Sequence, residues 1–181
     1  MQLNAYLNFN GNCAEALDFY ERHLGGRVEF RLTYGEAPPM PSDRADQPGC
    51  AGMDFPAGWD AKIMHARMAL GNTVIMVSDV PPAMYRPAGG IEMTLNVDTP
   101  QEAERLFAAL SEGGEVKMPL AETFWAEKFG SVTDRFGIPW LINCEGRTKQ
   151  AAVSACSPNR LRAACRQTKR PLVRAAFPIS V

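Results

Sequence analysis

The order of elements in this chain is first visible in residues 2–24, QLNAYLNFNGNCAEALDFYERHL, where an alternating segment leads directly into a helical one. In residues 2–9, apolar and polar residues alternate, which is typical of a strand with one buried and one more polar face. After a short polar break, Asn12 followed by Glu15 predicts a capped helix start. Apolar residues then recur at helical spacing as far as Leu24, so the stretch predicts a strand followed by an amphipathic helix.

Three further strands are predicted before the middle of the chain, at residues 27–34, 61–70 and 73–78. The first is separated from the others by residues 35–59, which are rich in proline and glycine and predict a long loop. Gly71-Asn72 predicts a two-residue hairpin between the last two strands. The first half therefore has the predicted order β-α-β-β-β.

The same order recurs about 88 residues later. The predicted elements of this second half are a strand at 91–97, a helix that begins at Thr99 and Pro100, a short strand at 115–118, and a hairpin formed by strands 125–133 and 138–144. Thr99 with Glu102 forms the same kind of helix-start signature as in the first half. An internal repeat of this length predicts two βαβββ units.

The composition is typical of a globular protein, with 46% hydrophobic and 22% charged residues. No apolar run approaches the roughly 18 residues that a membrane helix needs, and the N-terminus has no signal-peptide pattern. We therefore expect a cytoplasmic protein with no membrane partner. The five cysteines form no CxxC pair, and in that compartment they predict buried apolar residues or free thiols. For Cys13, at a predicted helix start, the alternative is a nucleophile, but no partner base can be identified.

Charge divides the chain into two parts. Residues 148–181 contain 7 of the 19 basic residues and no acidic one, so residues 1–147 hold 12 basic against 20 acidic residues, a net charge of −8. An acidic body argues against a nucleic-acid partner, which would require a basic face. The basic tail is predicted to be a poorly ordered extension, and the alternative is a segment that contacts an anionic partner.

Three long motifs link the chain to a known family. They are YLNFNGNCAEALDFYERHLGG at 6–26, KIMHARMALGNTVIMVSD at 62–79 and FWAEKFGSVTDRFGIPWLIN at 124–143. In order and spacing they resemble the vicinal oxygen chelate superfamily (glyoxalase, bleomycin resistance, dioxygenase), in its PhnB-like branch, over residues 1–147. The resemblance implies an α+β fold in which two βαβββ modules, about 1–80 and 88–147, form a curved mixed sheet around a cavity. It also implies a homodimer that binds a small-molecule ligand.

In metal-using members of that superfamily, each module supplies one ligand from its first strand and one from its last. By the resemblance, these four positions are Asn4, Met76, Glu92 and Leu141. Only Glu92 is a competent ligand for a hard divalent ion, because methionine and leucine offer none of the usual oxygen or nitrogen donors. The sequence therefore predicts no metal at the inherited site and no cofactor.

Other polar residues are predicted on the same face. If Gly71-Asn72 closes a two-residue hairpin, Arg67 lies opposite Met76 and His65 opposite Ser78. By the resemblance this is the cavity face. His65 and Glu92 are then candidates for a base and an acid, or for two ligands. The alternative for His65 is a structural hydrogen bond to a polar neighbour.

The aromatic residues of the second half have two predicted roles. Trp140 shares a strand face with other apolar residues and is predicted to lie in the core. Trp125, next to Phe124, either lines a pocket or has only a packing role. The complete set of candidate ligand-binding residues is Asn4, Tyr6, His65, Arg67, Met76, Glu92, Trp125 and Leu141.

The predicted function is that of a small-molecule-binding member of this superfamily without the usual divalent metal. Whether it is an enzyme stays open at this point. One alternative is a resistance-type protein that sequesters a drug or metabolite. A second alternative is a metal-dependent glyoxalase-type lyase or dioxygenase. Fold alone does not choose among them.

We predict that residues 148–181 are dispensable for the fold, because ordering a proline-interrupted tail costs more free energy than burial of its few large apolar side chains returns. A chain ending at Arg147 should stay in solution, keep its oligomeric state and melt within a few degrees of the full chain. Calorimetry and light scattering measure this. Aggregation, or a melting temperature more than about 10 °C lower, would show that the tail belongs to the core.

Overall fold

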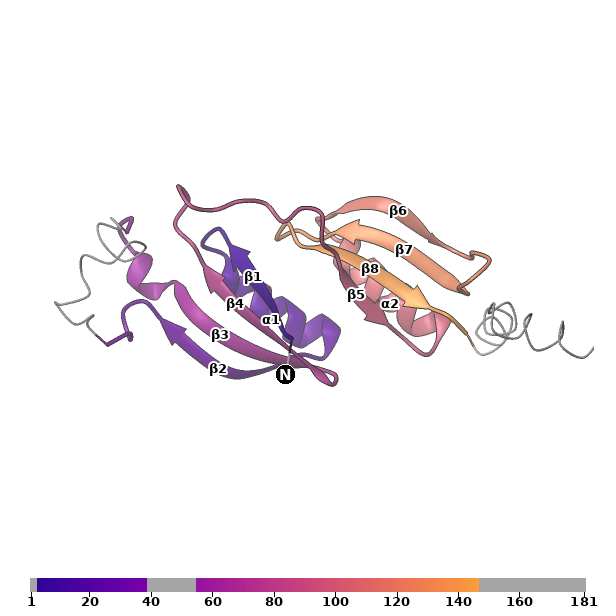
Figure 1. The fold of residues 1–181 in the computed structure, drawn as a ribbon, viewed down its shortest axis with the longest axis horizontal. Coiled ribbons are helices and arrows are strands. Elements are labelled where there is room, and N and C mark those ends of the chain that lie inside the picture. The colour runs from indigo at the N-terminus through magenta and orange to yellow at the C-terminus, as the bar shows by residue number, and fades with distance from the viewer. Residues whose placement is uncertain (1–2, 39–54, 147–181) are drawn as a thin grey trace, which may run out of the picture.

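The computed structural model describes residues 3–38 and 55–146. Three of the five cysteines, Cys50, Cys156 and Cys165, lie outside these ranges, as does the basic extension 148–181. The predictions for that extension therefore remain predictions. The described residues contain two helices, eight strands and one 3₁₀ turn (Figure 1).

The two halves of the chain have the same order of elements, which confirms the predicted repeat. The elements of the first half are β1 (Ala5–Phe9), α1 (Cys13–Leu24), β2 (Arg27–Thr33), the 3₁₀ turn η2 (Trp59–Ala61), β3 (Ile63–Leu70) and β4 (Thr73–Asp79). Those of the second half are β5 (Met93–Asn96), α2 (Pro100–Ser111), β6 (Glu115–Ala121), β7 (Lys128–Thr133) and β8 (Pro139–Cys144).

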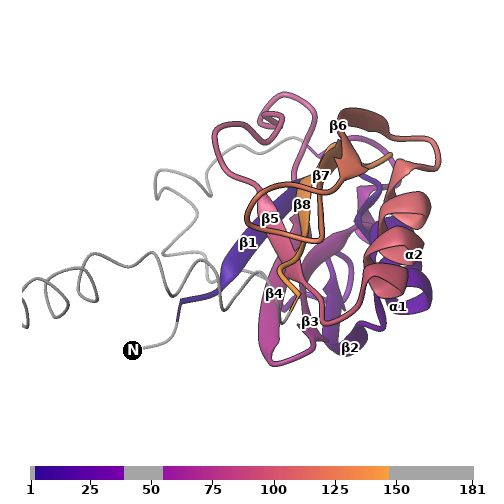
Figure 2. The same ribbon diagram turned by 90° about the vertical axis from the view of Figure 1, so that its right-hand side faces the viewer.

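Each half forms its own four-stranded mixed sheet, with strand orders β1-β4-β3-β2 and β5-β8-β7-β6. In each sheet the first and last strands of the module pair in parallel, and the other neighbours are antiparallel. Figure 2 shows α1 and α2 on the same side of the two sheets. We call the opposite side of each sheet its open face. The α+β fold of two βαβββ modules is thus confirmed, as two curved sheets that do not close on themselves.

The predicted hairpin register is also correct. Arg67 pairs with Met76 across β3 and β4, and the turn is closed between Leu70 and Thr73. Ala66 and Met68 point into the helix-covered core. Because side chains alternate along a strand, Arg67 and His65, which is two residues before it, lie on the open face.

Some element boundaries differ from the prediction. The strand predicted at 61–70 begins at Ile63, because a 3₁₀ turn at Trp59–Ala61, which overlaps the end of the predicted loop and the start of the predicted strand, precedes it. The predicted strand at 115–118 continues to Ala121. The strand predicted at 125–133 begins only at Lys128, so Trp125 lies in the preceding loop.

The start of α1 is capped by a residue other than the one predicted. The side chain of Asn12 makes no cap hydrogen bond. Instead Asp79, at the end of β4, accepts hydrogen bonds from the backbone N–H groups of Cys13 and Ile63, each at 2.9 Å. A charged acceptor supplied by the neighbouring strand satisfies a helix-terminal donor that the local sequence leaves open. In α2 the prediction holds, since Thr99 Oγ1 accepts from the backbone N–H of Glu102 at 3.2 Å.

The environment of Cys13 identifies it as a core residue. Its side chain is fully buried. Burial, together with the nearby Asp79 carboxylate, raises the pKa of the thiol well above its usual value. A buried thiol with a raised pKa favours the predicted role in core packing over the alternative of a nucleophile.

The core is continuous across both modules, and α1 connects them. Tyr20 donates a hydrogen bond of 2.6 Å to Asp134, which lies in the turn between β7 and β8. The same carboxylate accepts from Trp140 Nε1 at 2.8 Å and from the backbone N–H groups of Phe136 and Ile138. Trp140 is fully buried, which confirms its predicted place in the core.

We predict that Asp134→Ala destabilises the protein by about 3–5 kcal/mol, because it leaves four buried donors without their acceptor. The melting temperature should fall by roughly 10 °C. Asp18→Ala is the matched control, because Asp18 is an exposed carboxylate on α1, and it should change the melting temperature little. Calorimetry of both variants decides the matter, and equal, small shifts would contradict the role assigned to Asp134.

Candidate functional site

The open face of the first sheet carries a pair of hydrogen-bonded rings. The hydroxyl oxygen of Tyr6, on β1, lies 3.2 Å from Nδ1 of His65, on β3. The two ring centroids are 5.8 Å apart and the ring planes differ by 24°. This contact crosses β4, which lies between β1 and β3. One of the two groups donates the proton, and the tautomer of His65 decides which. In either tautomer Nε2 of His65 remains as a second polar atom.

Phe30 and Arg67 extend this face toward the edge of the sheet. Phe30, on β2, lies opposite Arg67 in the sheet register, and its ring centroid is 6.0 Å from that of His65. The side chain of Arg67 is 48% exposed. Its nearest carboxylate belongs to Glu29, at 3.8 Å, and that carboxylate is held more closely by Arg27, at 2.9 Å.

The two inherited positions of the first module lie beside this group. Met76, on β4, pairs with Tyr6 on one side and with Arg67 on the other. The three residues therefore form one row across the sheet. Asn4 immediately precedes β1 and is half-buried. The structure thus brings together the predicted residues Tyr6, His65, Arg67 and Met76.

The second module has a separate group on its own sheet. Ser131 Oγ, on β7, donates a hydrogen bond of 3.0 Å to Glu92 Oε1. Leu141, on β8, pairs with Ser131 and with Thr94. Glu92 and Leu141 also line a pocket of about 630 Å³, whose other lining residues are Ala88, Gly89, Gly90, Ile91, Lys117, Thr133 and Pro139.

Trp125 packs against other aromatic side chains of the second module. Its side chain, in the loop before β7, is 36% exposed. It packs edge-on against Phe124 and Phe129, at centroid distances of 4.5 and 5.4 Å. It does not line the pocket that contains Glu92 and Leu141.

The structure does not join His65 to Glu92. His65 is hydrogen-bonded to Tyr6 and Glu92 to Ser131. Within residues 3–38 and 55–146, no hydrogen bond or ion pair connects the two groups, and no cluster of three histidine, cysteine or acidic side chains could hold a metal ion. The four inherited positions offer one carboxylate, one amide and two apolar side chains, which does not fit the donor set of a divalent ion.

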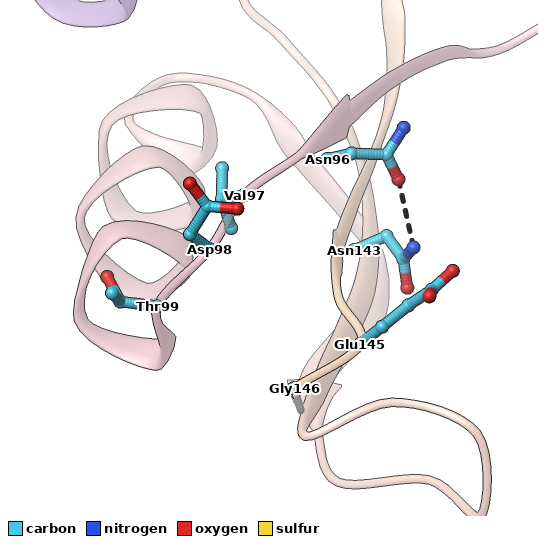
Figure 3. Close-up of a pocket in the computed structure, with 7 residues that line it drawn as sticks. All are labelled: Asn96, Val97, Asp98, Thr99, Asn143, Glu145 and Gly146. Carbon is cyan, nitrogen blue, oxygen red and sulfur yellow. Dashed lines mark hydrogen bonds between the residues drawn. The ribbon is translucent and has the colours of Figure 1, made fainter. Parts of the chain in front are cut away.

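A pocket of about 680 Å³ contains none of the predicted site residues (Figure 3). It lies at the carboxyl ends of β5 and β8, where Asn143 Nδ2 donates to Asn96 Oδ1 at 2.9 Å. The first module has a matching contact, since Ser78 Oγ donates to Asn8 Oδ1 at 3.2 Å. Asn8 and Asn96 are separated by the length of the repeat, and this recurrence was the signal in the sequence that could have identified the position.

The chemistry available differs between the two sheets. The first offers a phenol, an imidazole and a guanidinium on one face, which together can bind an anion and transfer a proton. The second offers a carboxylate and a hydroxyl. Among the described residues, no helix is long and apolar enough to span a membrane.

Comparison with known proteins agrees with this architecture. The model of the Glyoxalase/Bleomycin resistance protein/Dioxygenase superfamily matches residues 2–142. Protein YjdN of Escherichia coli (strain K12) is 39% identical over 144 residues, which cover 79% of this chain and 95% of YjdN.

Two solved structures have a similar fold. Protein PA1353 from Pseudomonas aeruginosa is 48% identical, with a TM-score of 0.68 over 81% of this chain and 98% of that one. A PhnB protein from Bacillus cereus, described as a putative 3-demethylubiquinone-9 3-methyltransferase, is 20% identical, with a TM-score of 0.62 over 80% of this chain and 99% of that one. At that identity it shows the fold alone. The chain therefore belongs to the glyoxalase/bleomycin resistance protein/dioxygenase superfamily, as the three motifs in its sequence predicted.

Proposed function

We propose that this protein binds a small molecule on the open face of its first sheet, through Tyr6, His65 and Arg67, without a divalent metal at the inherited positions. One observation carries the proposal. Three chemically active side chains from two strands lie together on the sheet face opposite to α1 and α2. Residues in such a place contribute little to the core, and polar groups that converge on one surface are typical of ligand sites.

We propose that a second copy of the chain completes the site. Large apolar side chains remain exposed on the strands, among them Tyr6 at 47%, Phe30 at 46% and Met118 at 47%. Exposed apolar surface of this kind favours association. In a homodimer, Glu92, Leu141 and Trp125 of the second module are available as the opposite wall of a cleft. Both cysteines in the described residues are buried free thiols, which is compatible with a cytoplasmic setting.

The contact between Tyr6 and His65 favours an enzyme over a sequestering protein. A phenol hydrogen-bonded to an imidazole provides a route for proton transfer to a bound molecule. A groove for a cationic drug would instead require acidic walls, and the first sheet presents Arg67 in that place. The sequestering function remains the second candidate, because residues 1–147 carry a net charge of −8. Turnover separates the two, since a sequestering protein returns its ligand unchanged.

We predict that library molecules bound by the full chain lose binding in the double variant Tyr6→Phe/His65→Asn. Saturation-transfer NMR detects the bound molecules, and chromatography of the recovered molecules shows whether they were consumed. Arg31→Met is the control, because Arg31 pairs with Ala66 on the helix-covered side of the same sheet. Binding that survives in the double variant would place the site elsewhere.

We also predict that the purified protein holds no stoichiometric divalent metal, because Glu92 is the one hard ligand among the four inherited positions. Elemental analysis of protein from metal-supplemented cultures should return far less than one Zn, Ni, Fe or Mn per chain, with the same result for Glu92→Gln. About one metal per chain in the unaltered protein, lost in Glu92→Gln, would contradict this prediction.

A further inference from the structure

We propose that the molecule bound on the first sheet is a planar aromatic carboxylate. Arg67 holds the carboxylate, and the rings of Tyr6, His65 and Phe30 contact the aromatic ring. This inference rests on the proposed function and adds the chemical class of the ligand. It follows from the charge, the ring geometry and the difference between the two modules.

Arg67 supplies the positive charge of this surface. Its guanidinium is half-exposed, and its ion pair with Glu29, at 3.8 Å, is longer than the 2.9 Å pair that Arg27 makes with the same carboxylate. Glu29 is therefore engaged mainly by Arg27. The planar guanidinium has five N–H donors, and its geometry matches a carboxylate through two parallel hydrogen bonds. A carboxylate is therefore an anion that this side chain is well suited to bind.

Three aromatic side chains supply the ring contacts of this surface. His65 contacts Tyr6 at a centroid distance of 5.8 Å and Phe30 at 6.0 Å, and both flanking rings are nearly half exposed. Tyr6 is on β1 and Phe30 on β2, at the two edges of a four-stranded sheet, so the surface extends over about 14 Å. Exposed ring faces and edges favour another aromatic ring. The size is suited to one ring with its substituents.

The second module provides an internal comparison. The row Tyr6, Met76, Arg67 on the first sheet corresponds to Thr94, Leu141, Ser131 on the second, by the same strand pairings. The centre of the row is apolar in both modules. Thr94 stands in place of Tyr6, and Ser131 stands in place of Arg67. The two sheets therefore share a geometry and differ in chemistry, and the row on the first sheet is the one that carries a cation and an aromatic ring.

Four probes of similar size test the inference by calorimetry on the full chain. They are 4-hydroxybenzoate, a planar anion; cyclohexanecarboxylate, a non-planar anion; benzamide, a planar neutral molecule; and benzamidine, a planar cation. We expect 4-hydroxybenzoate to bind at least tenfold more tightly than each of the others. Arg67→Met should weaken its binding by about tenfold to a hundredfold, which corresponds to the loss of a charge-assisted hydrogen bond. Tyr6→Leu and Phe30→Leu should each weaken it several-fold.

Two further variants separate charge from folding. Arg67→Lys keeps the charge and removes the planar fork, so its affinity should lie between those of the unaltered protein and Arg67→Met. Arg31→Met removes a cation from the other side of the same sheet and should leave the affinity unchanged. All variants should melt within a few degrees of the unaltered protein, since Arg67 lies outside the core.

The outcomes distinguish this inference from the proposed function. If 4-hydroxybenzoate shows no binding or no preference, while other library molecules still depend on Tyr6 and His65, the ligand class is wrong and the proposed function stands. If no molecule depends on Tyr6 and His65, both are wrong. If Arg67→Met dissociates an oligomer in light scattering, Arg67 serves contact with a second copy, and the inference is overturned.

Discussion

The structure depends on one buried carboxylate. Asp134 lies in the β7–β8 turn of the second module and accepts hydrogen bonds from two side chains and two backbone groups. One of those side chains, Tyr20, belongs to α1 of the first module. Each βαβββ unit has its own sheet, so the repeat alone does not make the two units pack together. The Asp134 contacts fix α1 against β8 and give the two modules one continuous core.

This fixed packing determines which faces remain open. Both helices lie on one side of the two sheets, so the alternating side chains of every strand divide into a core set and an open set (Figure 2). Phe9, Ile75 and Val77 belong to the core set. Tyr6 and Met76, which alternate with core-facing residues along β1 and β4, belong to the open set. The candidate site is therefore a consequence of helix placement as much as of the residues themselves.

The same frame carries different chemistry in each module. At the four positions that the resemblance assigns to metal ligands, this chain has one carboxylate, one amide and two apolar side chains. On the first sheet, a phenol, an imidazole and a guanidinium occupy the face next to those positions. Such groups bind and protonate without a metal ion. The two modules have the same strand pairings, but the side chains on their open faces differ.

The sequence by itself determined the secondary structure and much of the pairing. Local signals are sufficient for this, since alternation marks strands, 3.6-residue spacing marks helices, and Gly71-Asn72 fixes a hairpin register. The register placed Arg67 beside Met76 without any knowledge of the fold. Predicted strand boundaries were wrong where tertiary packing overrides the local preference of the chain. At Lys128, for example, the strand begins three residues later than predicted.

Only the tertiary structure decided the contacts between residues distant in the chain. The cap of α1 comes from Asp79, 66 residues away, although Asn12 stands at the local capping position. The contact of Tyr6 with His65, and its separation from Glu92, also depend on how strands from distant segments are placed. Local sequence sets which conformation each segment prefers, whereas these contacts arise from packing the segments together, and a single sequence contains no local signal for that arrangement.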